Sequence, residues 1–187
     1  MAAELIVVRH ADTDWTLSGQ HTGRSDIPLN EAGRVNASSL AAKLARRAYA
    51  EVWSSPLSRA LETTELAGFA DPQLRADAAE WDYGFYDGLT STQIRERRPD
   101  WDLWRDGCPD GETAQEVGAR ADRLLAALPD EGTVLLFSHG HMLRVVLARW
   151  LGLTAQDGAL FLLAPGGVGE LTHEHGRRVL GGWGPTA

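Results

Sequence analysis

Two stretches of consecutive apolar residues each end close to a histidine. Residues 5–8 are four apolar residues, three of them β-branched, and are followed directly by Arg9 and His10. Residues 134–137 form a second apolar run, and His139 follows it. Such runs predict strands buried on both faces, as in parallel sheets. Because the carboxyl ends of these strands lie at one edge of an open α/β sheet, we expect the two histidines to face one cleft.

Helical and strand-like patterns alternate along the rest of the chain. Residues 11–28 and 101–112 show no sustained periodicity, so we expect loops there. The expected helices cover residues 30–48, 55–66, 90–98, 113–128 and 142–151, and the expected further strands cover 51–54, a short segment within 71–79, 159–163, 167–173 and 177–180. This order predicts a three-layer α/β/α fold around a mostly parallel sheet. We expect one domain over residues 1–187, with residues 84–112 as a partial lid over the site.

Composition and charge limit the size of the core and the kinds of partner that the chain can have. Of its 187 residues, 43% are hydrophobic and 24% charged, which is enough apolar material for one sizeable core. A formal net charge of −8 argues against nucleic acid and anionic membranes as partners, while a local basic pocket for an anion stays allowed. Cys108 is the only cysteine, so neither an intramolecular disulfide nor a cysteine-based metal site can form. The absence of a leader-like start or a membrane-length apolar run predicts a cytoplasmic protein, with homodimerisation left open.

A set of histidine, arginine and carboxylate side chains suits phosphate chemistry. Neutral His10 can attack phosphorus and form a phosphohistidine, which divides the transfer into two easier steps. Arg9 and Arg59 offer permanent charge and bidentate donors, and His139 opens a helix whose N–H groups favour anions. The leaving oxygen needs a proton, and Glu80 is the preferred donor. Three carboxylates of the same regions are alternatives to it: Asp12, Asp82 and Asp87.

Three motifs resemble the landmarks of the histidine phosphatase superfamily, the phosphoglycerate mutase-like proteins. They are Arg9-His10-Ala11-Asp12, similar to the Arg-His-Gly-Glu signature of the family, Arg59 within residues 54–63, and Ser138-His139-Gly140. Their order matches the family, and the resemblance extends to about residue 153. It implies a phosphoglycerate mutase-like fold, His10 as the phosphorylated nucleophile, Glu80 as the proton donor and acceptor, and Arg9, Arg59 and His139 as the rest of the phosphate pocket. The substrate-side residues that it implies are Thr16, Thr22, Gly23, Tyr83 and Gly140.

The resemblance favours hydrolysis over mutase chemistry. Residues 80–90 and 104–112 are similar to small bacterial acid phosphatases and a fungal sugar-bisphosphatase of this family. Mutases of the family generally carry a longer cover with paired arginines, where this chain has Arg105 and Asp106. A shorter cover admits the water that hydrolysis needs. The expected function is therefore a metal-independent phosphomonoesterase, without a cofactor, that acts on small phosphorylated metabolites such as sugar phosphates. A mutase-type phosphotransferase, a protein-histidine phosphatase and a phosphate-binding module are the alternatives.

Other site chemistries fit the sequence less well. His139 with His141, and His173 with His175, could be drawn as metal ligands, but the chain lacks a His-Glu-x-x-His motif. A cysteine phosphatase needs an arginine six residues after Cys108, where this chain has alanine. A phosphate-binding loop of the Gly-x-x-x-x-Gly-Lys type is absent. Four of the seven tryptophans are candidate pocket walls, although core packing is the simpler expectation for at least half of them: Trp15, Trp81, Trp101 and Trp104.

Overall fold

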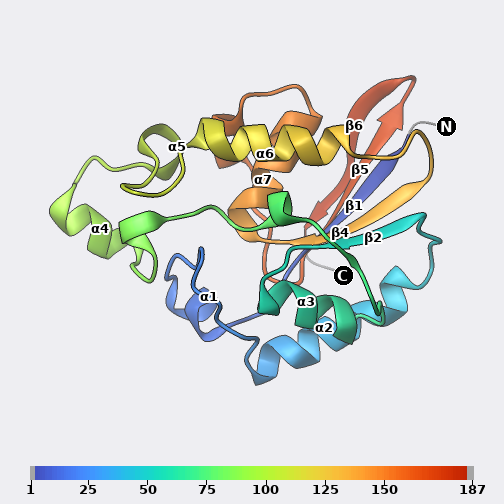
Figure 1. The fold of residues 1–187 in the computed structure, drawn as a ribbon, viewed down its shortest axis with the longest axis horizontal. Helices are drawn as coiled ribbons and strands as arrows, with labels where there is room; N and C mark the ends of the chain where they lie inside the picture. Colours follow the sequence, from blue (N-terminus) through green and yellow to red (C-terminus); the bar gives the residue numbers. More distant parts are fainter. Residues whose placement is uncertain (1–2, 185–187) are drawn as a thin grey trace.

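A computed structural model describes residues 3–184, which contain one six-stranded sheet in the order β3-β2-β4-β1-β5-β6 (Figure 1). Strands β3, β2, β4 and β1 run parallel, and β5 and β6 extend the sheet in antiparallel pairing. The strands are β1 (Glu4–Arg9), β2 (Glu51–Ser54), β3 (Gln73–Leu74), β4 (Thr133–Ser138), β5 (Val168–Glu174) and β6 (Arg177–Gly184). The prediction of a mostly parallel sheet is confirmed.

Helices cover both faces of the sheet. Figure 1 shows α2 (Glu31–Leu44) and α3 (Ser58–Leu66) on one face, and α6 (Ala114–Ala126) and α7 (Gly140–Trp150) on the other. Side chains of β1 alternate between the two resulting cores: Leu5 and Val7 pack with α6 and α7, and Ile6 and Val8 pack with α2. This alternation explains why the strand reads as an unbroken apolar run, and the predicted three-layer architecture is confirmed.

The two strands that precede the histidines are neighbours. β1 pairs with β4 in parallel register, with Val8 opposite Phe137 and Arg9 opposite Ser138. The backbone N–H of His10 continues the pairing by donating to the Ser138 carbonyl at 2.9 Å. The segments that follow β1 and β4 therefore leave the sheet at the same edge, as the hydrophobic pattern predicts.

Four local predictions are wrong. The expected loop of residues 11–28 contains the short helix α1 (Asp14–Ser18), and that of residues 101–112 contains α5 (Leu103–Asp106). Both helices are too short to show an apolar stripe, and their capping residues were the only signal. Helix α3 begins at Ser58 with Leu57 as its N-cap, and not at Pro56 with Ser55 as its cap. Residues 159–163 form no strand, because the 3₁₀ helix η3 (Ala155–Leu160) occupies the first part of that range.

The segment expected to form a lid lies beside the loop that follows β1. It contains η2 (Gly84–Tyr86), α4 (Ser91–Arg97) and α5, and Figure 1 shows α4 extending away from the sheet, on the same side as α1. Gln20 forms a β-bridge with Thr90, and the Asp87 carboxylate accepts hydrogen bonds from the backbone N–H groups of Gly23 and Ser25. Residues 84–112 thus support residues 20–25. The cavity over His10 has none of residues 84–112 in its lining.

The start of α2 packs directly on the backbone just after His10. A Cβ atom on Gly33 would lie 2.1 Å from the Asp12 carbonyl oxygen, and that oxygen also accepts from the Asn30 N–H. We expect Gly33→Ala to lower the free energy of unfolding by about 1–3 kcal/mol, since helix and loop must separate. Urea denaturation measures this change. Val35→Ala, on the exposed side of the same helix, is the control and should change stability by at most about 0.5 kcal/mol.

The remaining short element between β3 and the site is the 3₁₀ helix η1 (Ala76–Ala78). Among residues 3–184, no helix is long and apolar enough to cross a membrane.

Candidate active site

His10 lies at the carboxyl end of β1 and is 3% exposed. Its Nδ1 is 2.8 Å from the carbonyl oxygen of Ala11. A carbonyl can only accept, so Nδ1 carries the proton and Nε2 keeps its lone pair. Thr63 of α3 fixes the adjacent backbone, because its hydroxyl accepts the Ala11 N–H at 3.1 Å. These two contacts leave Nε2 as the nitrogen of His10 that can react.

His139 lies beside His10 at the amino end of α7. The ring centroids are 5.1 Å apart, and His139 is fully buried. Its Nε2 is 2.7 Å from the Ser55 hydroxyl, and that hydroxyl oxygen accepts the Leu57 N–H. If the Ser55 proton points to Nε2, the Nδ1 of His139 is the protonated nitrogen. Ser55 was predicted to cap α3, but the N-cap of that helix is Leu57, and the Ser55 hydroxyl contacts the histidine.

Two arginines complete the basic side of the site. Arg59 of α3 is fully buried and donates to the carbonyl oxygens of Thr22, Gly23 and Ser25 at 2.9–3.2 Å. Arg9 donates from Nη1 to the Leu163 carbonyl at 2.6 Å. The Arg9 guanidinium lies close to the backbone of Gly140: a Cβ atom at position 140 would be only 3.1 Å from the guanidinium carbon.

Three buried nitrogen atoms around His10 lack a partner within residues 3–184: the donors Arg9 Nε and Arg59 Nε, and the ring nitrogen Nδ1 of His139. A buried polar atom without a hydrogen bond is costly, commonly by about 1–3 kcal/mol. An anion with several acceptor oxygens would satisfy such donors together, and phosphate is the anion whose geometry guanidinium groups match. The unpaired atoms thus indicate an anion site next to the free nitrogen of His10.

Glu80 enters the site from the segment after η1 and is 9% exposed. Its Oε1 accepts the N–H groups of Trp81 and Met142, each at 2.9 Å, and its Oε2 accepts that of His141 at 3.2 Å. The first turn of α7 therefore holds this carboxylate. From the sequence, those N–H groups were expected to face the phosphate, and this expectation is wrong for His141 and Met142.

Arg120 of α6 fixes the backbone that carries Glu80. Its guanidinium donates to the carbonyl oxygens of Asp77, Ala79 and Glu80 and forms an ion pair with Glu112 at 2.7 Å. Arg120 was not predicted from the sequence, because a charged position on an amphipathic helix normally faces solvent.

A cavity of about 190 Å³ opens over His10. It is lined by Arg9, His10, Trp15, Thr16, Gly19, Gln20, His21, Thr22, Glu80, Tyr83, Gly140, His141, Arg144, Leu162 and Leu163. Arg59 and His139 are fully buried and are not in the lining. Of the substrate-side residues that the resemblance implies, Gly23 also falls outside the lining; its N–H donates to Asp87 and its carbonyl accepts from Arg59.

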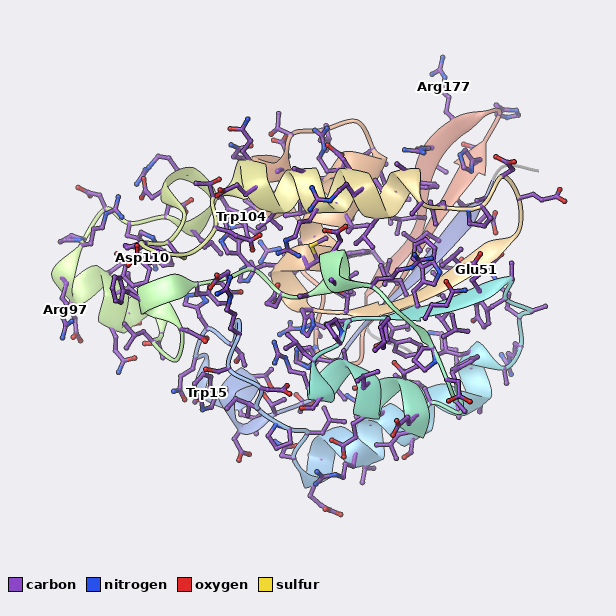
Figure 2. All side chains as sticks on the ribbon, viewed as in Figure 1. Trp15, Glu51, Arg97, Trp104, Asp110 and Arg177 are labelled. Carbon is purple, nitrogen blue, oxygen red and sulfur yellow. The ribbon has the colours of Figure 1, made fainter. Side chains whose placement is uncertain are left out.

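Thr16 lines the cavity, but its hydroxyl takes part in the cap of α1. It donates to the Thr13 carbonyl at 2.8 Å and accepts the Thr13 N–H. Of the four candidate tryptophan walls, Trp15 lines the cavity and Trp81, Trp101 and Trp104 do not. In Figure 2, Trp15 lies on α1, whereas Trp104 lies near the start of α6.

His141 and Arg144 were not predicted from the sequence to belong to the substrate side of the site. Both lie on α7 and line the cavity. They are three residues apart and so share a face of the helix. Their three-residue spacing was the available signal. His21, Leu162 and Leu163 also line the cavity, but they come from irregular segments with no comparable pattern.

Burial sets the protonation of the two histidines. It lowers the pKa of His10 well below 6.5, and the positive charges of Arg59 and Arg9 lower it further. Burial also lowers the pKa of His139 well below 6.5, with Arg59 and His10 adding to the effect. A lowered pKa keeps the imidazole neutral to more acidic pH, so His10 stays nucleophilic on the acid side of 6.5.

An NMR titration of the histidine ring protons tests this. We expect the midpoints of His10 and His139 well below pH 6.5. Arg59→Met should raise the midpoint of His10, because one neighbouring positive charge is lost. Arg123→Met, which removes an exposed arginine paired with Asp77, is the matched control and should leave it in place. A midpoint at or above 6.5 for His10 in the unmodified protein would contradict the effect of burial and of the two arginines on this histidine.

The described residues contain no group of three or more His, Cys, Asp or Glu side chains that could hold a metal ion. His139 and His141 do not converge: Nε2 of His139 contacts Ser55, and Nδ1 of His141 lies 2.6 Å from the Tyr83 hydroxyl. The site is thus built of histidine, arginine and one carboxylate.

A family model of the histidine phosphatase superfamily (branch 1) matches residues 5–186. The chain belongs to this superfamily. The expectation of a phosphatase-type hydrolase with a phosphoglycerate mutase-like fold is confirmed. As a histidine phosphatase, the chain carries its three landmark motifs on the elements described above.

Relatives support this membership along the whole chain. An acid phosphatase of Mycobacterium tuberculosis is 40% identical over 182 residues, which cover 94% of this chain and 89% of the relative. A sedoheptulose 1,7-bisphosphatase of Saccharomyces cerevisiae is 30% identical over 91% of this chain and 87% of its own length. The solved structure of a Mycobacterium tuberculosis open reading frame product superposes with a TM-score of 0.93 at 37% identity, over 100% of this chain and 99% of that one.

Proposed function

We propose that this histidine phosphatase is a metal-independent phosphomonoesterase that hydrolyses small phosphorylated metabolites through a phosphohistidine on His10. The observation that carries the proposal is the free Nε2 of His10, which is left unprotonated by the Nδ1 contact to Ala11 and surrounded by unpaired buried donors. The names of the relatives, an acid phosphatase and a sugar bisphosphatase, agree with it.

The first step transfers the phosphoryl group to the enzyme. Nε2 of His10 attacks phosphorus, the N–P bond forms and the ester P–O bond breaks. Arg9, Arg59 and Nδ1 of His139 supply donors for the three phosphoryl oxygens, over which the negative charge is spread in the transition state. Protonated Glu80 gives its proton to the leaving oxygen.

The second step returns the enzyme to its starting state. Glu80, now a carboxylate, takes a proton from water while the water oxygen bonds to phosphorus and the N–P bond breaks. The backbone N–H groups of α7 hold the carboxylate in one place through both steps, so the same group serves as acid and then as base.

The size and lining of the cavity favour a metabolite over a phosphorylated protein. A volume of about 190 Å³ fits a small ester, and the lining mixes polar with aromatic side chains. We propose sugar phosphates and similar polyol esters as substrates. The free, buried Cys108 suits a reducing compartment, and we place the reaction in the cytoplasm.

A screen of phosphate release tests the function. The purified chain is incubated with sugar phosphates, nucleotides, phosphoglycerates and p-nitrophenyl phosphate in excess chelator, beside a coupled mutase assay. We expect release from several esters that chelator does not reduce. Mutase turnover with little release would contradict the proposal, as would activity that chelator abolishes or silence in both assays.

A further inference from the structure

Tyr83 and His141 form a pair on the wall of the cavity that the proposed mechanism does not use. Tyr83 is 2% exposed, and its hydroxyl lies 2.6 Å from Nδ1 of His141. Both residues line the cavity. The backbone N–H of His141 donates to the carboxylate of Glu80, so His141 contacts both the proposed proton donor and the cavity.

The direction of the hydrogen bond between them follows from burial. Burial raises the pKa of Tyr83 well above 10 and lowers that of His141 well below 6.5, so phenol and imidazole are both neutral. If Nδ1 of His141 donated, the phenolic proton would be buried without an acceptor among residues 3–184, which is unfavourable. If the phenol donates, the phenolic proton and the lone pair of Nδ1 are both paired. Nδ1 is then the acceptor, and the imidazole proton sits on Nε2.

The surrounding rings hold the His141 imidazole in place. Tyr83, Trp81 and Trp104 contact it edge to face, with centroids 5.4–6.3 Å away, and His21 lies at 6.0 Å. Its Nε2 makes no hydrogen bond to residues 3–184, yet it is not among the polar atoms sealed from solvent. An N–H on this atom is therefore available to a molecule in the cavity.

We propose that Tyr83 is a positioning residue that fixes His141 in its Nε2–H tautomer, and that this N–H donates to a hydroxyl oxygen of the substrate's organic part. The contact selects phosphate esters of sugars and polyols over esters whose organic part has no free hydroxyl group. The substrate contact rests on the proposed function; the tautomer does not. A donor fixed in advance costs less to order on binding than a free one.

The tautomer is tested first, without substrate. A long-range ¹H–¹⁵N spectrum distinguishes Nε2–H from Nδ1–H imidazole, and we expect His141 as Nε2–H. Tyr83→Phe should convert this signal into a mixture of tautomers. Tyr86→Phe also removes a phenolic hydroxyl, but Tyr86 packs on Trp101 and is outside the cavity lining, so it should leave the signal unchanged. His141 as Nδ1–H, or a spectrum indifferent to Tyr83→Phe, would overturn the proposal.

Kinetics test the substrate contact. We expect His141→Leu to lower kcat/KM for glucose 6-phosphate about ten times more than kcat/KM for p-nitrophenyl phosphate, which has no hydroxyl to accept the bond. His141→Gln, whose side-chain amide can donate from a similar place, should recover part of the difference. Equal losses on both esters would overturn the contact. Failure of the unmodified protein to hydrolyse any ester would overturn the proposed function and the contact with it, and would leave the tautomer result standing.

Discussion

His10→Gln is expected to lower kcat for ester hydrolysis by about 10⁴-fold or more, the scale seen when a covalent nucleophile is lost. Glutamine is similar in size to histidine and keeps polar contacts, but its amide has no nucleophilic lone pair. The effect follows from the geometry of His10, whose Nε2 is the reacting atom because Nδ1 contacts the Ala11 carbonyl. Initial rates at saturating p-nitrophenyl phosphate measure it.

The matched control for this variant is His175→Asn. His175 lies in the turn between β5 and β6 with φ of 49°, a backbone conformation that asparagine tolerates. We expect the His175→Asn protein to hydrolyse p-nitrophenyl phosphate at the rate of the unmodified protein. Circular dichroism and the thermal midpoint establish that both variants fold. A folded His10→Gln protein within tenfold of the unmodified rate would contradict covalent catalysis at this residue.

Glu80→Gln is expected to affect two substrates differently. It keeps the shape of the side chain but removes the transferable proton, so kcat/KM for glucose 6-phosphate should fall by about 10²–10⁴-fold. The nitrophenolate leaving group needs little protonation, and kcat/KM for p-nitrophenyl phosphate should fall far less. Because Glu80 also activates water in the second step, a burst of nitrophenolate followed by slow turnover should appear. Stopped-flow absorbance records both phases.

Asp82→Asn is the control for Glu80→Gln. Asp82 is two residues away, forms an ion pair with Arg24 at 2.8 Å and accepts the Gly84 N–H. It does not line the cavity over His10. We expect its rates to stay close to those of the unmodified protein on both esters. Equal losses on the two esters for Glu80→Gln, together with a selective loss for Asp82→Asn, would reassign the acid to Asp82.

The sequence predicts the parts of the site that follow directly from buried strands. The apolar runs before His10 and His139 define β1 and β4, and the parallel pairing of these strands brings both histidines to one edge. Arg59 follows β2 in the same way, in the first turn of α3. These placements are predictable because a strand buried on both faces has a strong apolar signal and its carboxyl end has a defined location.

The sequence does not predict contacts that depend on how loops pack. Ser55 could be assigned as a helix cap from its neighbours, but its hydroxyl binds His139, which lies 84 positions further along the chain. Likewise, the N–H groups that begin α7 were expected to face the substrate, and two of them hold Glu80. In both cases a local hydrogen-bonding rule is overridden by a partner that only the tertiary fold brings near.

The substrate side of the cavity shows the same limit. His141 and Arg144 lie three residues apart on α7, so the face that they share is recoverable from their spacing. Leu162 and Leu163 reach the cavity from a segment after η3 that was predicted as a strand, and no periodicity marks them. The shape of the cavity thus depends largely on irregular segments, whose conformation local sequence determines weakly.

Trapping the phosphorylated enzyme tests the central claim most directly. The protein is mixed with p-nitrophenyl phosphate, quenched in alkali within one turnover to preserve phosphohistidine, digested and mapped by mass spectrometry, while ³¹P–¹H correlation identifies the phosphorylated nitrogen. We predict one phosphate per chain, on Nε2 of His10, with greater accumulation in Glu80→Gln than in the unmodified protein. Phosphate on Nδ1 of His10, on another residue, or on no residue while nitrophenolate is released would contradict a covalent mechanism through Nε2 of His10.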